Sequence, residues 1–402
     1  MSARSATNGA TADVVIIGGG VIGLTIARSL VRRGVRGVTL VERARFGAEA
    51  SSSAAGILAP QVEADRNDEL FRLMCASRDL YPWFADALRE EVDVDVELDR
   101  TGTLYVGFNG QDEIEFKRRL MWQTEQGLRI ELLAAVDART IEPHISERLG
   151  CALRFPNDWQ VENRKLVEAL VKANDKFGVC MLEGCEVKSV RIENDQVQGV
   201  QTSKGSIVTK TVVMAAGAWS SFVDSPDVSL PGILIEPVRG QMLCFKSATA
   251  QTRHVLYTAR GYVVPRRDGR LLAGSTSDHV GFDKRVTVDG IGNIRSAAAE
   301  IIPALRHLSL FDSWAGLRPR AEDDFPVLGP ASEIGGLFYA TGHYRNGILL
   351  APITGELIAE AIVTGVPSIS LTPFLPDRFC HKPNPEDRHA APADARAADS
   401  RF

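Results

Sequence analysis

The stretch that decides the fold spans residues 13–42 and reads DVVIIGGGVIGLTIARSLVRRGVRGVTLVE. It opens with a short apolar run over residues 14–18 and closes with a second one over residues 38–42. A helix-like stretch, residues 21–33, lies between them. Two apolar strands joined by a helix predict a strand–helix–strand unit with parallel strands. We therefore expect an α/β fold built on a parallel sheet.

The turn between the first strand and the helix reads GGGVIG, with glycines at Gly18, Gly20 and Gly23. Gly18 permits a tight turn, Gly20 lets the backbone approach a pyrophosphate, and Gly23 lets the helix pack on the strand. The helix N-terminus then offers N–H groups to phosphates. Glu42 ends the next strand, where a carboxylate accepts hydrogen bonds from ribose hydroxyls. Together these features predict dinucleotide binding rather than a turn that merely packs a helix, but they do not separate FAD from NAD.

Two later segments favour FAD. Residues 214–220 read MAAGAWS and residues 340–350 read ATGHYRNGILL. In each, a strand runs into a Gly-containing loop and a helix follows. FAD needs several such approaches because adenosine, pyrophosphate and isoalloxazine extend across the sheet. Each segment alone would also fit an ordinary helix start.

The rest of the chain suggests a second domain inserted into the nucleotide domain. A small antiparallel meander is predicted over residues 186–209, and longer alternating strands over residues 233–275. A helix is expected over residues 69–91, with a kink or break at Pro82. The predicted FAD-binding domain comprises residues 13–92, 144–228 and 319–379, the substrate domain residues 93–143 and 229–318, and disordered tails residues 1–12 and 380–402.

Composition excludes several classes of protein. The net charge of −5 and the pI near 5.9 give no reason to expect a nucleic-acid or acidic-membrane partner. No apolar run approaches the roughly 20 residues of a bilayer span, and the polar N-terminal segment predicts a cytoplasmic protein. The six cysteines form no CxxC pair, so we expect reduced thiols, without a disulfide frame or a metal site.

Further motifs carry a resemblance to a known family. The stretches SSSAAG (residues 51–56), PVRGQ (residues 237–241) and AAGAWS (residues 215–220) resemble the D-amino-acid oxidase superfamily of FAD-dependent oxidoreductases. WAGLRP (residues 314–319) and GHYRNGILLAP (residues 342–352) are similar to the glycine oxidases within it. The resemblance runs over residues 13–379.

This resemblance implies a Rossmann-like FAD-binding domain with an inserted mixed-β substrate domain, and FAD held without a covalent link. The implied reaction is oxidative deamination of glycine, sarcosine or a small D-amino acid to the oxo acid, ammonia and hydrogen peroxide. Molecular oxygen would be the electron acceptor, and the implied setting is thiamine biosynthesis. The cofactor would accept the electrons from the substrate, and the protein would orient the substrate beside it.

The resemblance also implies site residues. Arg318 matches the arginine that binds the substrate carboxylate, Tyr262 a tyrosine lining the substrate pocket, and Arg345 a second basic residue near it. Ser277 and Ile57 stand where the best-known glycine oxidases have methionines. The fingerprint, the quoted stretches and the resemblance together predict these FAD contacts: Gly18, Gly20, Val21, Ile22, Gly23, Glu42, Arg43, Ala50, Ser51, Ser52, Ala55, Gly56, Ile57, Val187, Gly217, His343, Tyr344, Arg345, Asn346, Gly347, Ile348 and Leu349.

The chemistry of these residue types agrees with the roles. A guanidinium such as that of Arg318 matches a carboxylate with two parallel hydrogen bonds and stays charged when buried. His343 is expected to bond the backbone or the cofactor, without acid–base work. Ser277 and Ile57 leave open an oxidase or dehydrogenase of another D-amino or N-methyl amino acid.

Three other classes of protein are alternatives to an amino-acid oxidase. A tRNA-modifying flavoprotein is disfavoured by the acidic pI and the lack of a basic face. An NAD-dependent dehydrogenase is disfavoured by the two extra cofactor-facing segments. A flavoprotein that only binds its cofactor stays open, as does the oligomeric state, a homo-oligomer included.

Overall fold

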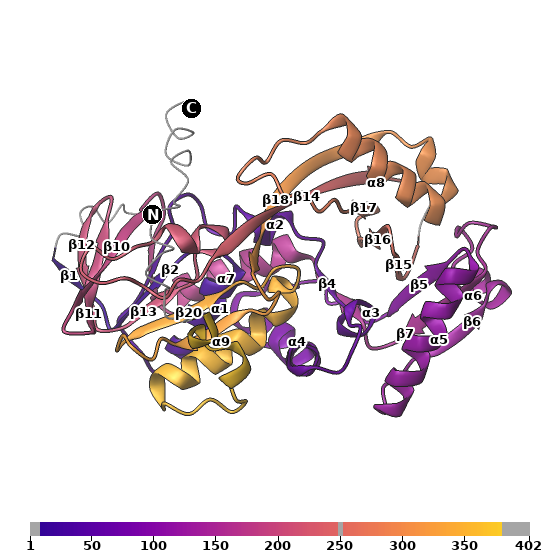
Figure 1. Cartoon of the computed structure of the whole chain (residues 1–402). Coiled ribbons are helices and arrows are strands. Elements are labelled where there is room, and N and C mark those ends of the chain that lie inside the picture. The colour runs from indigo at the N-terminus through magenta and orange to yellow at the C-terminus, as the bar shows by residue number, and fades with distance from the viewer. Residues whose placement is uncertain (1–8, 248–251, 380–402) are drawn as a thin grey trace, which may run out of the picture.

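The computed structural model describes residues 9–247 and 252–379 (Figure 1). Its central layer is a six-stranded sheet in the order β19-β20-β13-β2-β3-β9, parallel except for β19. The strands are β2 (Val14–Ile17), β3 (Val38–Val41), β9 (Cys180–Leu182), β13 (Val212–Met214), β19 (Val327–Pro330) and β20 (Leu337–Thr341). They come from three distant parts of the chain, as expected for a discontinuous α/β domain.

Alternate residues of β2 face two different layers. Val14 and Ile16 pack among four helices on one face of the sheet. Val15 and Ile17 pack against a four-stranded sheet in the order β1-β12-β11-β10 on the other. These layers comprise α1 (Val21–Arg32), α4 (Glu69–Val92), α7 (Asn163–Lys176) and α9 (Gly347–Val363), and β1 (Ala10–Thr11), β10 (Val187–Glu193), β11 (Gln196–Thr202) and β12 (Gly205–Val208). Burial on both faces explains why the β2 sequence is continuously apolar.

The second large layer is an eight-stranded sheet in the order β18-β14-β17-β16-β15-β5-β7-β6. Its strands are β5 (Thr103–Gly107), β6 (Glu131–Ala134), β7 (Cys151–Phe155), β14 (Ile235–Lys246), β15 (Val255–Thr258), β16 (Gly261–Pro265), β17 (Arg270–Gly274) and β18 (Leu310–Ala321). Leu243 and Phe245 of β14 pack with α8 (Val288–Ile301), whereas Met242 and Cys244 face the opposite side together with Tyr262. The long β14–β18 pair reaches from the first layer into the second (Figure 1).

The remaining elements are short or lie at the periphery. They are α2 (Ala50–Ser53), β4 (Ile57–Leu58), α3 (Pro60–Glu63), α5 (Gly110–Glu125), α6 (Ala135–Ile141), β8 (Trp159–Gln160), and the 3₁₀ turns η1 (Gly217–Phe222), η2 (Pro303–Arg306), η3 (Thr372–Phe374) and η4 (Pro376–Phe379). β4 pairs with β8 in a two-stranded sheet. In Figure 1, β4 lies between the two large layers.

Two details differ from the sequence prediction. The predicted disordered segment 1–12 includes β1, which pairs in parallel with β12 and is tied by Ala12 N–H to Val208 O at 2.9 Å. The predicted disorder of residues 1–8 and 380–402 lies outside the described residues. The predicted break at Pro82 does not occur, because α4 continues through it while the neighbouring Tyr81 and Phe84 stay buried in the core.

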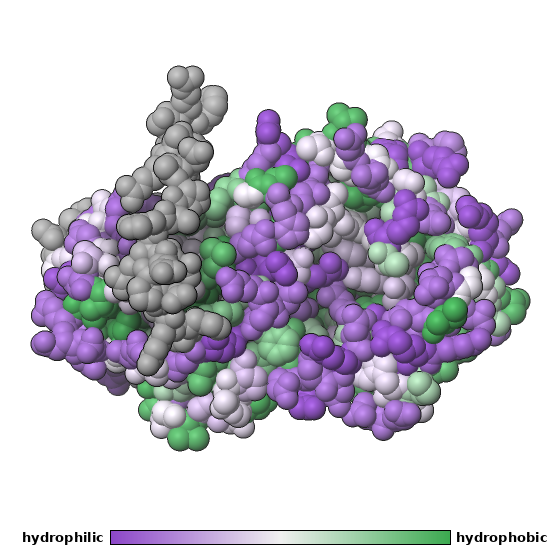
Figure 2. All heavy atoms as spheres, viewed as in Figure 1, coloured by the Kyte–Doolittle hydropathy of each residue, from purple (hydrophilic) through white to green (hydrophobic). Residues whose placement is uncertain are grey.

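The domain boundaries remain a prediction. β7 pairs with β5 and β6 in the eight-stranded sheet, although the boundary expected at residue 144 assigns it to the nucleotide domain. We propose moving that boundary past Phe155. No helix in the described part of the chain is long and apolar enough to cross a membrane. The face shown in Figure 2 is mostly hydrophilic, with hydrophobic residues in small separate patches, as is ordinary for a water-exposed surface.

Candidate active site

One elongated cavity lies between the two large layers and collects residues from distant parts of the chain. It is lined by these predicted residues: Gly18, Gly20, Val21, Ile22, Glu42, Arg43, Ala50, Ser51, Ala55, Gly56, Ile57, Val187, Gly217, Tyr262, Arg318, His343, Tyr344, Arg345, Asn346, Gly347, Ile348 and Leu349. Gly23, Ser52 and Ser277 do not line it. The structure thus brings nearly the whole predicted set to one place, while their roles stay predictions.

The Gly-rich turn between β2 and α1 has the geometry that a pyrophosphate site needs. Gly18 has φ +110°, and a Cβ there would lie 2.3 Å from the carbonyl oxygen of Ala215. A Cβ on Gly23 would lie 2.0 Å from Gly18 O, so this glycine packs the helix on the turn instead of lining the cavity. At Gly20 an added Cβ would meet only Ser51 Oγ, at 3.3 Å. The space in front of Gly20 therefore suits a group that approaches the backbone closely.

Glu42 follows β3 and lines the same cavity. Its carboxylate accepts hydrogen bonds from Gly19 N–H and Ala44 N–H, both at 2.8 Å. These bonds fix the side chain beside the Gly-rich turn and leave further lone pairs for ribose hydroxyls. Next to it, the Arg43 guanidinium lies 3.7 Å from the centroid of the Trp219 ring. The geometry fits the adenosine half of a dinucleotide.

The wall formed by residues 50–57 is fixed by buried polar contacts. Arg266 donates hydrogen bonds to Ala55 O at 2.7 Å and to Val161 O at 3.0 Å, and it pairs with Glu162 at 3.2 Å. Gly56 has φ +68°, and a Cβ there would lie 2.0 Å from Val161 O. The backbone of this wall is thus held against the strand that precedes α7, and it cannot shift without breaking these contacts.

The C-terminal wall comes from the loop between β20 and α9. His343 is buried, and its Nε2 lies 3.1 Å from Thr354 Oγ1. Burial lowers the pKa of His343 from its usual 6.5 to about 3, so the ring is neutral and does no acid–base work near neutral pH. Gly347 and Ile348, the first residues of α9, line the cavity. A helix N-terminus at this place can stabilise negative charge on a bound ring.

Arg318 projects from β18 into the cavity. Its Nη2 donates to Ser275 Oγ at 2.6 Å and its Nη1 to Thr276 O at 3.1 Å. Both acceptors are neutral, and among the described residues no carboxylate forms an ion pair with Arg318. The guanidinium has five N–H donors, so it keeps donors and an uncompensated charge for an anionic ligand.

Arg345 has a different environment. Its Nε lies 3.6 Å from Glu63 Oε2, and its Nη2 donates to Tyr257 Oη at 2.9 Å. Glu63 raises the pKa of Arg345, and burial raises the pKa of Tyr257, so the guanidinium stays charged and the phenol neutral. Arg345 is therefore already neutralised by a carboxylate, unlike Arg318. Glu63 and Tyr257 could not be predicted as site residues, because neither belongs to a motif.

Tyr262 lies on the cavity-facing side of β16. Its ring stacks on Tyr257 with centroids 5.8 Å apart, and its hydroxyl lies 3.4 Å from Met242 Sδ. A thioether is a weak acceptor, so this hydroxyl remains able to donate to a ligand oxygen. Ser277 is exposed, and its Oγ lies 3.4 Å from the hydroxyl of Tyr344, a cavity-lining residue. Ser277 thus reaches the cavity only through Tyr344.

In the described ranges, no three or more His, Cys, Asp or Glu side chains are grouped so that they could hold a metal ion. The five cysteines within the described ranges are free thiols, as expected, and Cys380 lies outside them. The Gly-rich turn and Glu42 fit a dinucleotide, and Tyr262 and Arg318 in the same cavity keep donors for a further ligand.

Comparison with known proteins agrees with this fit. The family described as FAD dependent oxidoreductase matches residues 13–361. A glycine oxidase of Geobacillus kaustophilus is 34% identical over 92% of this chain and 98% of its own. The crystal structure of glycine oxidase from Geobacillus kaustophilus superposes with a TM-score of 0.86 over 91% of this chain and 98% of that one. The bifunctional protein ThiO/ThiG of Trichormus variabilis is 35% identical over 92% of this chain and 55% of its own.

Proposed function

The chain belongs to the family of FAD-dependent oxidoreductases, and from this premise we propose that it oxidises glycine or a similarly small amino acid. The products are the oxo acid, ammonia and hydrogen peroxide, with oxygen and water consumed. The similarity to glycine oxidases supports this substrate class, and the similarity to a ThiO/ThiG protein supports a place in thiamine biosynthesis.

The observation that carries the proposal is Arg318. Its guanidinium lines the cavity, is held by two neutral oxygens, and forms no ion pair with a described carboxylate. A buried or half-buried cation without a partner is unfavourable unless a ligand supplies the opposite charge. A substrate carboxylate would do so with two parallel hydrogen bonds.

The protein's contribution to the reaction is to bind and orient the substrate and the cofactor. Arg318 would hold the carboxylate, and Tyr262 would donate a hydrogen bond to it from the same side of the cavity. When bound, FAD supplies the two-electron acceptor for the substrate Cα–H and passes the electrons to oxygen. The residues 50–57 and the N-terminus of α9 would hold the flavin ring, and the Gly-rich turn with Glu42 would hold the pyrophosphate and ribose.

The purified holoenzyme gives a direct test. Under anaerobic conditions glycine should bleach the visible flavin bands, and in air it should yield peroxide and glyoxylate in equal amounts. Flavin bands that glycine, sarcosine and small D-amino acids all leave unchanged would contradict the proposal and favour a flavoprotein that only binds its cofactor.

Arg318→Ala tests the carboxylate anchor. We expect kcat/KM for glycine to fall by two or more orders of magnitude, about 3–5 kcal/mol, because the carboxylate is left unpaired. FAD should stay bound. Arg318→Lys keeps the charge but loses the two-pronged geometry, and should also be strongly impaired. Arg320→Ala is the matched control, since Arg320 lies two residues along β18 and pairs with Asp324 and Glu236 outside the cavity. An Arg318→Ala enzyme within about threefold of wild type, about 0.65 kcal/mol, would exclude this role.

Ser277 and Ile57 support a second candidate, an oxidase or dehydrogenase of another D-amino or N-methyl amino acid. Ile57 lines the cavity, and the Ser277–Tyr344 contact makes its rim polar. A panel of glycine, sarcosine and D-alanine, followed by peroxide and by an artificial electron acceptor, separates the two. Higher kcat/KM for a bulkier amine than for glycine would favour the second candidate.

A further inference from the structure

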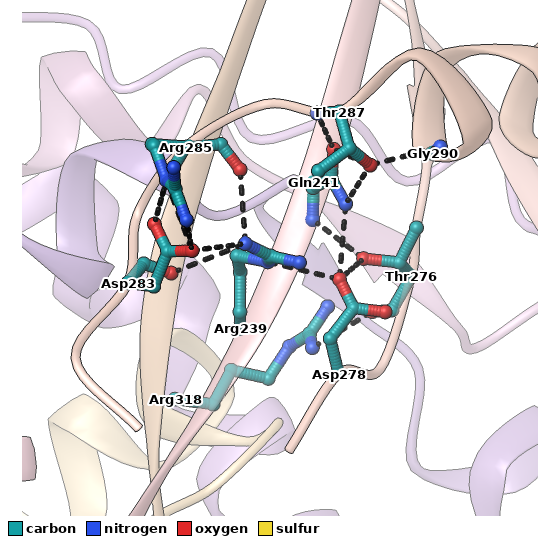
Figure 3. A network of polar contacts seen from close by, with 9 residues as sticks. All are labelled: Arg239, Gln241, Thr276, Asp278, Asp283, Arg285, Thr287, Gly290 and Arg318. Atoms are coloured by element: carbon teal, nitrogen blue, oxygen red, sulfur yellow. Dashed lines mark hydrogen bonds and ion pairs between the residues drawn. The ribbon is translucent and has the colours of Figure 1, made fainter. Parts of the chain in front are cut away.

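Residues 275–287, which we name the bridging loop, connect β17 to α8 beside Arg318 (Figure 3). The first two residues of the bridging loop supply both described acceptors of the Arg318 guanidinium, Ser275 Oγ at 2.6 Å and Thr276 O at 3.1 Å. The direction in which Arg318 presents its remaining donors therefore depends on where this loop holds Thr276.

Asp278 fixes Thr276. The Thr276 hydroxyl donates to Asp278 Oδ2 at 2.9 Å and accepts from Gln241 N–H at 3.1 Å. The same carboxylate oxygen accepts from Gln241 Nε2 at 2.9 Å and from Arg239 Nε at 3.0 Å. Asp278 Oδ2 thus accepts three hydrogen bonds, one from the bridging loop and two from side chains of β14. Thr276 is held between the Asp278 carboxylate and the backbone of β14.

The backbone strengthens the same connection. Arg239 N–H donates to Asp278 O and Asp278 N–H donates to Arg239 O, both at 2.9 Å. The Arg239 side chain is buried, and it also reaches Asp283 Oδ2 at 3.3 Å and the carbonyl oxygen of Arg285 at 3.1 Å. Burial alone would raise the pKa of Asp278, but hydrogen bonds from Gln241, Thr276 and Arg239 lower it below its usual value. Asp278 is therefore ionised at working pH.

None of these supporting residues belongs to the cavity wall. The cavity is lined by Arg318 and Ser275, and not by Arg239, Gln241, Thr276 or Asp278. Figure 3 shows the guanidinium of Arg318 beside Asp278 and Thr276, with Arg239 above it between the Asp283–Arg285 pair and Asp278. Arg318 is the cationic cavity residue through which this network can act on a bound carboxylate.

We propose that Asp278 is a positioning residue that orients Arg318 for the substrate carboxylate, acting through Thr276 and anchored by Arg239. The inference rests on the proposed role of Arg318. It assigns a function to the arginine of the PVRGQ stretch: Arg239 binds no substrate but holds the loop that aims the arginine which does.

A double-mutant cycle on the holoenzyme tests this coupling. Asp278→Ala is made in the wild type and in Arg318→Ala, and glycolate is titrated against the visible flavin spectrum alongside kcat and KM for glycine. In the wild type, Asp278→Ala should weaken glycolate binding and raise KM about tenfold, with kcat changed less than KM. In Arg318→Ala, the same substitution should change glycolate binding less than about twofold, because its effect passes through a side chain that is gone.

Two further variants separate positioning from other effects. Asp289→Ala removes a negative charge from the exposed first turn of α8, where Asp289 has no part in the network, and should leave glycolate binding unchanged. Asp278→Asn keeps an acceptor for Thr276 but loses the charge that pairs with Arg239, and should lie between wild type and alanine. If the alanine variant does not fold, the asparagine variant carries the same cycle.

The outcomes distinguish this inference from the proposed function. Equal losses from Asp278→Ala in both backgrounds, or no loss in the wild type, overturn the positioning role while Arg318→Ala still reports on the anchor. An unchanged glycolate affinity in Arg318→Ala alone overturns the anchor, and the positioning role with it. If Asp278→Ala weakens glycolate binding only when Arg318 is present, the result supports both the anchor role of Arg318 and the positioning role of Asp278.

Discussion

Gly240 lies directly beneath the guanidinium of Arg318, opposite Gly316 in the β14–β18 pair. A Cβ on Gly240 would lie 2.3 Å from Nη2 and 2.4 Å from Cζ of Arg318. The obstructed group is the end of a flexible side chain, so Gly240→Ala should displace the guanidinium instead of breaking the sheet. We expect KM for glycine to rise about tenfold with little change in Tm, because a small displacement of Arg318 weakens substrate binding and leaves the packing of the sheet intact.

The matched control for this variant is Gly232→Ala. Gly232 precedes β14 and has nothing within 4 Å of an added Cβ. Steady-state kinetics and thermal melts of both variants check the prediction. A Gly240→Ala protein that melts several degrees lower with an unchanged KM would show that the methyl group strains the sheet and leaves Arg318 in place.

His343 permits a prediction about pH. Its pKa of about 3 follows from burial, so the ring is neutral from weakly acidic pH upward. Replacing His343 by Gln should therefore leave the apparent pKa values of the kcat/KM profile unchanged between about pH 6 and 10, although FAD affinity falls with the loss of the contact to Thr354. Loss of an ionisation near pH 6 to 7 in the variant would instead identify His343 as an acid or base.

At the scale of elements, the bridging loop also reaches the cofactor half of the cavity. Phe282 packs against Trp219 and Phe222 with ring centroids 5.4 and 5.3 Å apart, and Lys284 Nζ lies 3.1 Å from Glu49 Oε2. Trp219, Phe222 and Glu49 all line the cavity. The far end of the loop thus packs on residues that line the part of the cavity we propose for adenosine, while its first residues hold Arg318.

Phe282→Ser should therefore loosen FAD. An aromatic pair of this kind contributes about 0.5–1.5 kcal/mol, so losing the equivalent of one such contact from the cavity wall should raise the Kd for FAD by roughly two- to tenfold. KM for glycine at saturating FAD should not change, because the Asp278 contacts that hold Thr276 lie earlier in the loop. Phe311→Ser is the control, an exposed phenylalanine of β18 outside the cavity. Equal FAD affinities for both variants, measured by fluorescence titration, would remove Phe282 from this role.

Sequence patterns predicted the elements better than the contacts between them. The strand–turn–helix of residues 13–42, the meander and α9 follow from local apolar periodicity and glycines, and the structure confirms them. The continuation of α4 through Pro82 and the pairing of β1 with β12 depend on distant partners, which local patterns do not contain. Arg318 was predicted from its motif and lines the cavity, while its role stays a prediction. Arg345 was predicted, but its partners Glu63 and Tyr257 were not, because they lie far from it in sequence and belong to no motif.

At the scale of the whole molecule, the cavity is the junction of two sheets with different tasks. The parallel sheet carries the Gly-rich turn and helix N-termini that we propose for the cofactor, while the eight-stranded sheet carries Tyr262 and Arg318, which we propose for the substrate. The segment around residues 49–57 connects the two, because Ala55 O accepts from Arg266 and Glu49 pairs with Lys284 of the bridging loop. Contacts on one sheet can therefore be altered without removing those on the other, which is why cofactor and substrate variants should separate in measurement.

The order β19-β20-β13-β2-β3-β9 has a consequence for how the chain is made. β2 and β3 leave the ribosome early, but their neighbour β13 follows about halfway along the chain, and β20 only near residue 341. Pairings this distant in sequence form slowly, and until they form the early strands expose open edges. Synthesis of most of the polypeptide must therefore precede completion of the nucleotide sheet. A nucleotide cofactor held by this sheet would therefore find its complete site only after most of the chain has been made.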